Sequence, residues 1–293
     1  MKQLSIFLLS LLLYGCSGGQ SKENVISITI EPQRYFIEKI AGERFQVNCI
    51  VPAGQSPETY DPTPKQMMQI GKSRAYLQIG EIGFEQAWME NIKQNNPQVS
   101  FFDLSQGFSF LENEAHDHAE CNGDHHHHHH GTLDPHIWSS IEGARTIAWN
   151  TLLALSTIDK EHAAEYWKNF EQLSDEINRL EQEIIALLQP LTHRAFIIYH
   201  PALTYFADEF NLRQLCIEMD GKEPSPSQLK ELIDVAREHE VKVVFIQQEF
   251  DKKNAELIAQ ETHCRTIPIN PLAYEWDKEM IRIAKSLADG QAD

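Results

Sequence analysis

Apolar and polar residues alternate in short blocks along most of the chain, and this pattern predicts two sets of strands and helices. Four apolar runs in the first half have the length and composition of buried strands: 25–30, 45–51, 75–79 and 99–102. Helical patterns lie between them, in a short stretch ending at 42 and near 64–72 and 83–94. The second half repeats the scheme, with strand runs at 195–199, 215–218, 241–246 and 265–269 and helical stretches near 201–209, 226–239 and 252–262. Strands that alternate with helices form βα units, so we predict an α/β fold with two parallel sheets.

A long amphipathic segment separates the two halves. Residues 159–188 contain neither glycine nor proline, and their apolar residues recur every three or four positions: Tyr166, Phe170, Leu173, Ile177, Leu180, Ile184 and Leu187. This spacing predicts one helix of about 30 residues, roughly 45 Å long, which Pro190 ends. The apolar stripe could pack on a partner helix in a coiled coil, or it could lie across both lobes. We predict lobes at 25–158 and 190–293, joined by a rigid linking helix at 159–189.

The first sixteen residues predict export. A single basic residue, Lys2, precedes an apolar run at 4–14 that is too short to span a bilayer as a mature helix. The run closes on Leu-Tyr-Gly-Cys, which resembles a bacterial lipobox in which Cys16 is acylated. We therefore expect a lipoprotein signal peptide at 1–16, a flexible tether at 17–24, and a lipid-anchored protein facing the periplasm or the cell exterior. The alternative is an ordinary signal peptide with a chance cysteine.

Composition excludes some partners. The chain is 42% hydrophobic and 23% charged, as in soluble globular proteins. A formal charge of −18 argues against nucleic acid or an anionic membrane surface as partner. The remaining cysteines fit neither a zinc ribbon nor a dense disulfide scaffold. Cys49 is predicted to lie in the core, Cys121 could join the neighbouring histidines on a metal, and Cys216 and Cys264 could pair in an oxidising compartment.

A histidine-rich loop lies in the middle of the chain. Residues 103–133 show no periodic pattern, and polar low-complexity sequence of this kind does not pack. Eight of the 14 histidines fall at 116–130, namely His116, His118, His125, His126, His127, His128, His129 and His130. Neutral imidazoles bind zinc, copper and nickel, so the tract predicts several weak, exchanging sites. It is expected to be an auxiliary metal loop, unless it is only a solvated surface loop.

A site of defined geometry is expected where strands end, because ligands of open α/β sheets bind beyond the carboxyl ends of the strands. Glu58 lies in the loop after 45–51, and His136 follows the strand at 99–102 and its long loop. His200 directly follows 195–199, and Asn270 directly follows 265–269. Taken singly, Glu58 could be a solvated carboxylate, His136 a helix-start residue and His200 a packed histidine. Two come from each half, so they could converge across one cleft, which favours His136 and His200 as metal ligands.

At these residues the sequence resembles a known family. The segments that carry the resemblance are VPAGQSPETYDPTPKQM, LDPHIWSS, YHPALTYFADEFNL, EPSPSQLKELI and NPLA, with the histidine-rich loop between the first two. In this order they resemble the solute-binding proteins of zinc and manganese ABC importers (the cluster A-I type), from about residue 25 to the end. The resemblance implies two α/β lobes bridged by a rigid helix, one divalent metal between them, and a monomer that delivers its ion to a membrane permease.

The resemblance also assigns roles to the candidate ligands. His136 stands where the family has its second metal-binding histidine, and His200 stands at the third ligand. Glu58 follows Pro57 where the family usually has a histidine, and Asn270 stands where it has an acidic ligand. Zinc prefers about four ligands, so water, Asn270, Glu275 or a loop histidine would complete the shell. Glu58 favours Mn²⁺ or Fe²⁺, whereas His200 and the loop favour Zn²⁺, which we predict.

The candidate ligands are also compatible with other classes of protein: an enzyme, a zinc buffer or an adhesin. Two histidines and a carboxylate resemble a hydrolytic zinc centre, but the chain has neither HExxH nor GxSxG. Glu218 and Asp220 are interpreted as strand-end residues and not as general bases. A zinc buffer could act through the histidine loop without a transporter, and a metal-independent adhesin is a further alternative. We predict a zinc receptor and not an enzyme.

Overall fold

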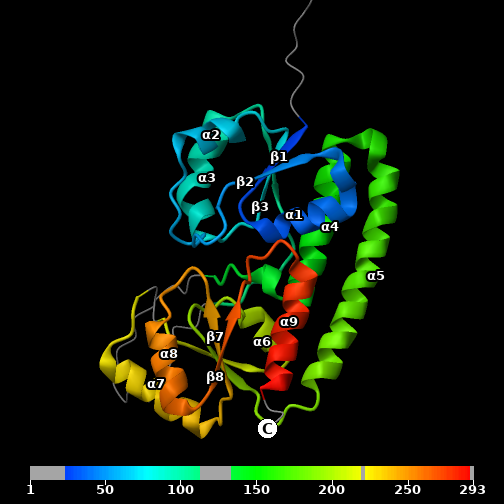
Figure 1. Cartoon of the computed structure of the whole chain (residues 1–293). Coiled ribbons are helices and arrows are strands. Elements are labelled where there is room, and N and C mark those ends of the chain that lie inside the picture. Colours follow the sequence, from blue (N-terminus) through cyan, green and yellow to red (C-terminus); the bar gives the residue numbers. More distant parts are fainter. Residues whose placement is uncertain (1–23, 113–132, 219–221, 291–293) are drawn as a thin grey trace, which may run out of the picture.

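The protein forms two parallel α/β lobes, one from each half of the chain (Figure 1). The computed structural model describes residues 24–112, 133–218 and 222–290. The first sheet has the order β2-β1-β3-β4 and consists of β1 (Val25–Ile28), β2 (Gln46–Cys49), β3 (Ala75–Gln78) and β4 (Ser100–Asp103). The second has the equivalent order β6-β5-β7-β8 and consists of β5 (Ala195–Ile198), β6 (Arg213–Cys216), β7 (Val243–Gln247) and β8 (Arg265–Ile269). All pairs are parallel, which confirms the predicted fold class.

Helices follow the strands in both lobes. The first lobe contains α1 (Glu31–Ala41), η1 (Gly42–Arg44), α2 (Pro64–Ile70), α3 (Gly83–Asn95), η2 (Ile137–Ser139) and α4 (Ile141–Ile158). The second contains α6 (Thr204–Glu209), α7 (Pro226–Glu238), α8 (Lys253–Thr262) and α9 (Trp276–Asp289). Helices α2 and α7 begin with the same capping box, in which Thr63 and Ser225 each accept a hydrogen bond from a backbone amide three residues on. In both, a proline then occupies the first turn.

The linking helix α5 (Ala163–Leu188) runs along both lobes, as Figure 1 shows. It has 26 residues, about 39 Å at 1.5 Å per residue, and buries Tyr166, Leu173, Ile177, Leu180, Ile184 and Leu188. It packs on α1, α4 and α9, so the stripe meets this chain's own helices instead of a coiled-coil partner. The predicted start at 159 is too early, because Asp159 accepts hydrogen bonds from the Tyr166 hydroxyl and from His162 Nδ1. A separate short helix, η3 (Lys160–His162), therefore precedes α5.

A second connection between the lobes comes from α9, which leaves β8 and packs along α5. The Trp276 ring is buried against Phe36 and Tyr35 of α1, with ring centroids 5.3 and 5.8 Å apart. Its Nε1 donates a hydrogen bond to the Trp138 carbonyl at 2.6 Å, and Trp138 Nε1 donates to the Pro271 carbonyl at 3.0 Å. One apolar cluster thus extends through both lobes, and a large buried interface of this kind restricts relative motion of the lobes.

The described cysteines are all free thiols. Cys216 is buried in the core, and Cys264 Sγ donates a hydrogen bond to the Val241 carbonyl at 3.0 Å, so the pairing considered from the sequence is not formed. Cys49 is half-buried against the first lobe's core. Cys16, Cys121 and the histidines at 116–130 lie outside the described residues. No described helix is both long enough and apolar enough to cross a membrane.

Candidate metal centre

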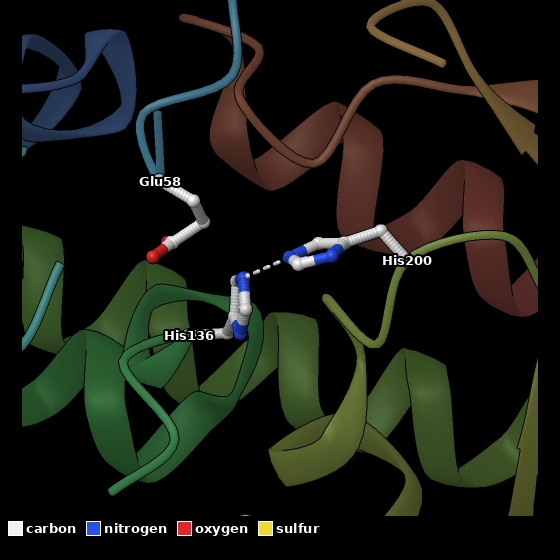
Figure 2. Close-up of side chains that lie close together, drawn as sticks. All are labelled: Glu58, His136 and His200. Atoms are coloured by element: carbon white, nitrogen blue, oxygen red, sulfur yellow. Dashed lines mark hydrogen bonds between the residues drawn. The ribbon is translucent and has the colours of Figure 1, made fainter. Parts of the chain in front are cut away.

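Three of the predicted ligands meet between the lobes. The ligand atoms of Glu58, His136 and His200 all lie within 4.8 Å of one another, and Figure 2 shows the three side chains directed at a common point. The Nε2 atoms of the two histidines are 3.1 Å apart. Glu58 and His136 come from the first lobe and His200 from the second, as the strand-end rule predicts.

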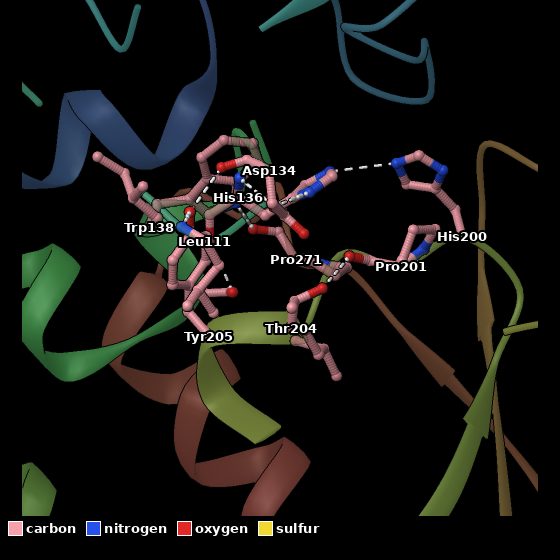
Figure 3. A network of polar contacts seen from close by, with 12 residues as sticks. Leu111, Asp134, His136, Trp138, His200, Pro201, Thr204, Tyr205 and Pro271 are labelled. Atoms are coloured by element: carbon pink, nitrogen blue, oxygen red, sulfur yellow. Dashed lines mark hydrogen bonds and ion pairs between the residues drawn. The ribbon is translucent and has the colours of Figure 1, made fainter. Parts of the chain in front are cut away.

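His136 is oriented by the residue two positions before it. Its Nδ1 donates a hydrogen bond to Asp134 Oδ1 at 2.8 Å, and the same oxygen accepts the His136 backbone N–H at 2.8 Å. The Asp134 carbonyl in turn accepts a hydrogen bond from the Tyr205 hydroxyl at 2.7 Å, which connects the segment to the second lobe (Figure 3). Because the carboxylate holds the proton on Nδ1, the Nε2 lone pair of His136 is directed into the site.

His200 has an equivalent arrangement, provided by Glu218, which the sequence analysis interpreted only as a strand-end residue. Its Nδ1 donates to Glu218 Oε2 at 3.1 Å, and its backbone N–H donates to Gln247 Oε1 at 2.9 Å. The ring of Phe250 stacks on the imidazole, with centroids 5.2 Å apart. Glu218 does follow the end of β6, as the sequence indicated. The interpretation was incomplete because it did not include the contact with His200. Asp220 lies outside the described residues.

The two facing nitrogens require a cation or a shared proton. Both Nδ1 atoms carry the protons that their carboxylates bind, so two Nε2 lone pairs are opposed at 3.1 Å. Two nitrogens bound to one tetrahedral zinc at about 2.05 Å would be about 3.3 Å apart. The separation in the structure is therefore close to that of two ligands of a single ion.

Glu58 presents a carboxylate oxygen with no protein partner. Its Oε2 accepts a hydrogen bond from the Gly83 backbone N–H at 3.0 Å, at the start of α3, where the helix dipole favours negative charge. Its Oε1 is buried and accepts no hydrogen bond. A β-carbon at Gly83 would lie 2.4 Å from the Glu58 carbonyl oxygen, so glycine permits this close approach. Glu58 thus lies beside the two histidines and is not a fully solvated loop carboxylate, and its buried oxygen fits a bound cation.

The charges around His136 favour a cation. Burial by itself would lower the pKa of His136, but the charge and hydrogen bond of Asp134, followed by the charges of Glu58 and Glu218, raise it above its ordinary value. Burial would likewise raise the pKa of Asp134, but its contacts with His136 hold it below its ordinary value. A divalent ion placed between the histidines would experience the same negative field.

The other candidates for the coordination shell are less suitably placed. Asn270 Oδ1 accepts a hydrogen bond from the Leu272 backbone N–H at 3.2 Å, so this oxygen takes part in a local turn. Glu275 lies at the start of α9, paired with Lys278, in a separate surface hollow beside Arg34. A small cavity of about 20 Å³ does adjoin both histidines, and it is also lined by Pro57, Trp138, Gln247, Glu249 and Phe250. It has room for about one water molecule or ion.

Two lobes held by rigid helices, with imidazoles and a carboxylate meeting between them, define a metal-binding receptor of the solute-binding class. The family described as "ZnuA: Zinc-uptake complex component A periplasmic" matches residues 26–288. The chain therefore belongs to the ZnuA family, which confirms the resemblance to the solute-binding proteins of zinc and manganese ABC importers. Members of this family are extracytoplasmic transport receptors and not enzymes, as predicted for this chain.

Individual relatives agree with the family membership. The chain is 26% identical over 248 residues to the high-affinity zinc uptake system protein ZnuA of Bacillus subtilis, covering 83% of this chain and 77% of that protein. A crystal structure of ZnuA matches with a TM-score of 0.82 and 36% identity, covering 90% of this chain and 98% of that one. The solute-binding protein FpvC of Pseudomonas aeruginosa, in complex with Mn²⁺, shares the fold, with a TM-score of 0.75, 23% identity and coverage of 92% of this chain and 98% of that one.

Proposed function

We propose that this protein captures Zn²⁺ between its two lobes and delivers it to the permease of an ABC importer. The observation that supports this most directly is the convergence of two imidazole Nε2 atoms and a buried carboxylate oxygen, with each histidine held by its own carboxylate. Imidazole nitrogen is a preferred zinc ligand, and an orienting carboxylate raises its basicity. His136, His200 and Glu58 are the proposed protein ligands, with zinc as the transported ion.

The main alternative is a receptor for Mn²⁺ or Fe²⁺. Glu58 supplies a hard oxygen ligand where the family usually has a histidine, and oxygen ligands suit manganese. Two imidazoles with carboxylate partners favour zinc, and so does the kinship with zinc-uptake proteins. Because divalent ions of the first transition row bind similar ligands, the two metals must be compared in direct competition.

The proposal includes how the receptor is held and supplied. Acylation of Cys16 would anchor the protein to a membrane by lipid, with residues 17–24 as a tether beside the permease. The histidines at 116–130 would act as a local collector that raises the zinc concentration near the fixed site. A buffer that works through this loop alone, without a transporter, is the second candidate function, because eight histidines could bind zinc without His136 and His200.

Competitive titration with Zn²⁺ and Mn²⁺ tests the proposal. We would compare the mature chain, a variant lacking residues 116–130, and the double variant H136A/H200A. We expect one tight zinc site that survives removal of the loop and is lost in the double variant, with manganese bound more weakly. The variant H193A/H239A, which changes two histidines of the second lobe outside the site, is the matched control.

Three results would contradict parts of this proposal. Tight zinc binding that disappears with the loop and persists in H136A/H200A would identify a tethered histidine buffer. Tighter binding of manganese than of zinc at the same site would identify a manganese receptor. Absence of palmitate incorporation at Cys16 in a bacterial host, with the protein released into the medium or periplasm, would contradict the lipid anchor.

A further inference from the structure

A fourth carboxylate lies beside the metal centre. Glu249 follows the end of β7 by two residues and lines the same small cavity as His136 and His200. Its Oε1 is buried and makes no hydrogen bond, which is also true of Glu58 Oε1. A carboxylate oxygen that is removed from water and left without a partner is costly, so such atoms in folded proteins call for a bound cation, a proton or an ordered water.

We propose that Glu249 is the fourth ligand of the bound ion, which completes a shell of two imidazole nitrogens and two carboxylate oxygens. This inference rests on the proposed function and concerns the same site. Each lobe then provides two ligands: Glu58 and His136 from the first, His200 and Glu249 from the second. The ion would join the lobes symmetrically, and metal binding would stabilise their contact.

The turn that carries Glu249 is firmly held. Gln247 Oε1 accepts the His200 backbone N–H, and the Phe250 backbone N–H donates to the Gln247 carbonyl at 3.3 Å. The Phe250 ring stacks between Tyr199 and His200, with centroids 5.1 and 5.2 Å away. The backbone at Glu249 is thereby held on both sides relative to His200, so the start of this side chain keeps its place beside the histidine.

Coordination requires rotation of the Glu249 side chain. Glu249 stands outside the group whose ligand atoms lie within 4.8 Å of one another, so its carboxylate must rotate toward the ion when the ion binds. Rotation about side-chain bonds costs little compared with the formation of a metal–oxygen bond. The ligands suggested by the sequence are less available, because Asn270 Oδ1 takes part in a local turn and Glu275 is paired with Lys278 elsewhere.

A transport receptor favours a protein ligand over water in the fourth position. A closed shell of four protein ligands leaves no open position for a reactive water, in agreement with a transport receptor.

Substitutions at this single position test the proposal on the full mature chain. We would measure Zn²⁺ affinity against a tight chelator, and the visible absorption of bound Co²⁺, for E249Q, E249H and the control E256Q on the exposed face of α8. We expect E249Q to weaken zinc binding by about 100-fold, the upper range for residues that only orient a ligand, and to change the Co²⁺ bands. E249H supplies a neutral nitrogen ligand and should recover much of the affinity for zinc.

The histidine variant separates coordination from a charge effect. If Glu249 acts only through its charge, E249Q and E249H should lose affinity equally, the loss should diminish in high salt, and the Co²⁺ bands should not change. Equal affinity in E249Q and E256Q would also overturn the proposal, with zinc bound by Glu58, His136, His200 and water. Either result leaves the receptor function intact as long as H136A/H200A abolishes tight binding, whereas tight binding in that variant would refute the proposed function itself.

Discussion

The carboxylate of Asp134 orients His136 in the site, and the substitution D134N tests this role. Asp134 is buried, and one of its oxygens accepts both the Nδ1–H and the backbone N–H of His136, each at 2.8 Å. An asparagine keeps the shape and one acceptor oxygen but removes the charge. His136 would then keep a neutral hydrogen bond from Nδ1 but lose the negative charge that makes Nε2 a stronger base.

The magnitude follows from two contributions. A hydrogen bond to a charged group contributes about 1.5–3 kcal/mol, against about 1 kcal/mol for a neutral one, so D134N should weaken zinc binding by about 0.5–2 kcal/mol. That corresponds to a loss of affinity of about 2- to 30-fold. The new amide group would occupy the place of Asp134 Oδ2, which has no hydrogen-bond partner, so about 1–3 kcal/mol of folding stability should be lost as well.

The assay is competitive zinc titration of D134N, with thermal unfolding of the metal-free protein measured in parallel. D61N changes an exposed aspartate in the loop before α2 and serves as the matched control. If D134N were less stable but bound zinc as tightly as D61N, Asp134 would be a structural residue only. The inference that it directs the His136 lone pair would then be wrong.

Three further predictions address the start of α3, the buried Glu85 and the connection between the lobes. G83A should weaken zinc binding and lower the melting temperature, because a β-carbon would meet the Glu58 carbonyl oxygen at 2.4 Å. Zinc titration and thermal unfolding check this, and unchanged affinity would contradict the role given to this close approach. Burial raises the pKa of Glu85 to about 7 despite hydrogen bonds from Thr29, Gly80 and Ile79, so the folded state binds a proton more tightly than the unfolded state. The stabilisation is complete below pH ~4.5 and declines by about 3 kcal/mol as the pH rises to ~7; chemical unfolding of E85Q should lack this slope, and parallel pH profiles would refute it. Small-angle scattering should show nearly equal radii of gyration with and without zinc, since α5 and α9 both join the lobes, and a large change would contradict their rigidity.

The apolar pattern was sufficient to predict the fold class, because parallel strands that are covered on both faces appear in the sequence as continuous apolar runs. Strand β1 is buried at all four positions, and its predicted run contains it entirely. Boundaries were less certain where packing competes with pattern. Strand β6 begins at Arg213, two residues before the predicted run, because backbone pairing with β5 continues through polar residues at the edge of the sheet. The start of α5 moved for a local reason, the hydrogen bonds that Asp159 accepts from His162 and Tyr166.

The strand-end rule predicted that Glu58, His136 and His200 lie close together, since the topology of parallel sheets places the carboxyl ends of strands at a common edge. The same rule could have identified Glu218 and Glu249, which follow β6 and β7, but many strand-end carboxylates face solvent. Their direction is determined by neighbours that only folding brings together, such as His200 for Glu218 and the cavity wall for Glu249. The hydrogen bond from Trp276 Nε1 to the Trp138 carbonyl, between residues 138 positions apart, had no counterpart in the local pattern.

The amino-acid sequence by itself determined the two-lobe α/β architecture, the linking helix and the identity of three converging side chains, because these depend on periodicity and on the order of strands. Only the tertiary structure decided that each histidine is held through Nδ1 by a carboxylate, and that both Nε2 atoms meet 3.1 Å apart. The physical reason is that the position of a proton and the direction of a lone pair depend on contacts between residues far apart in the chain. Such contacts exist only once both lobes have closed around the site.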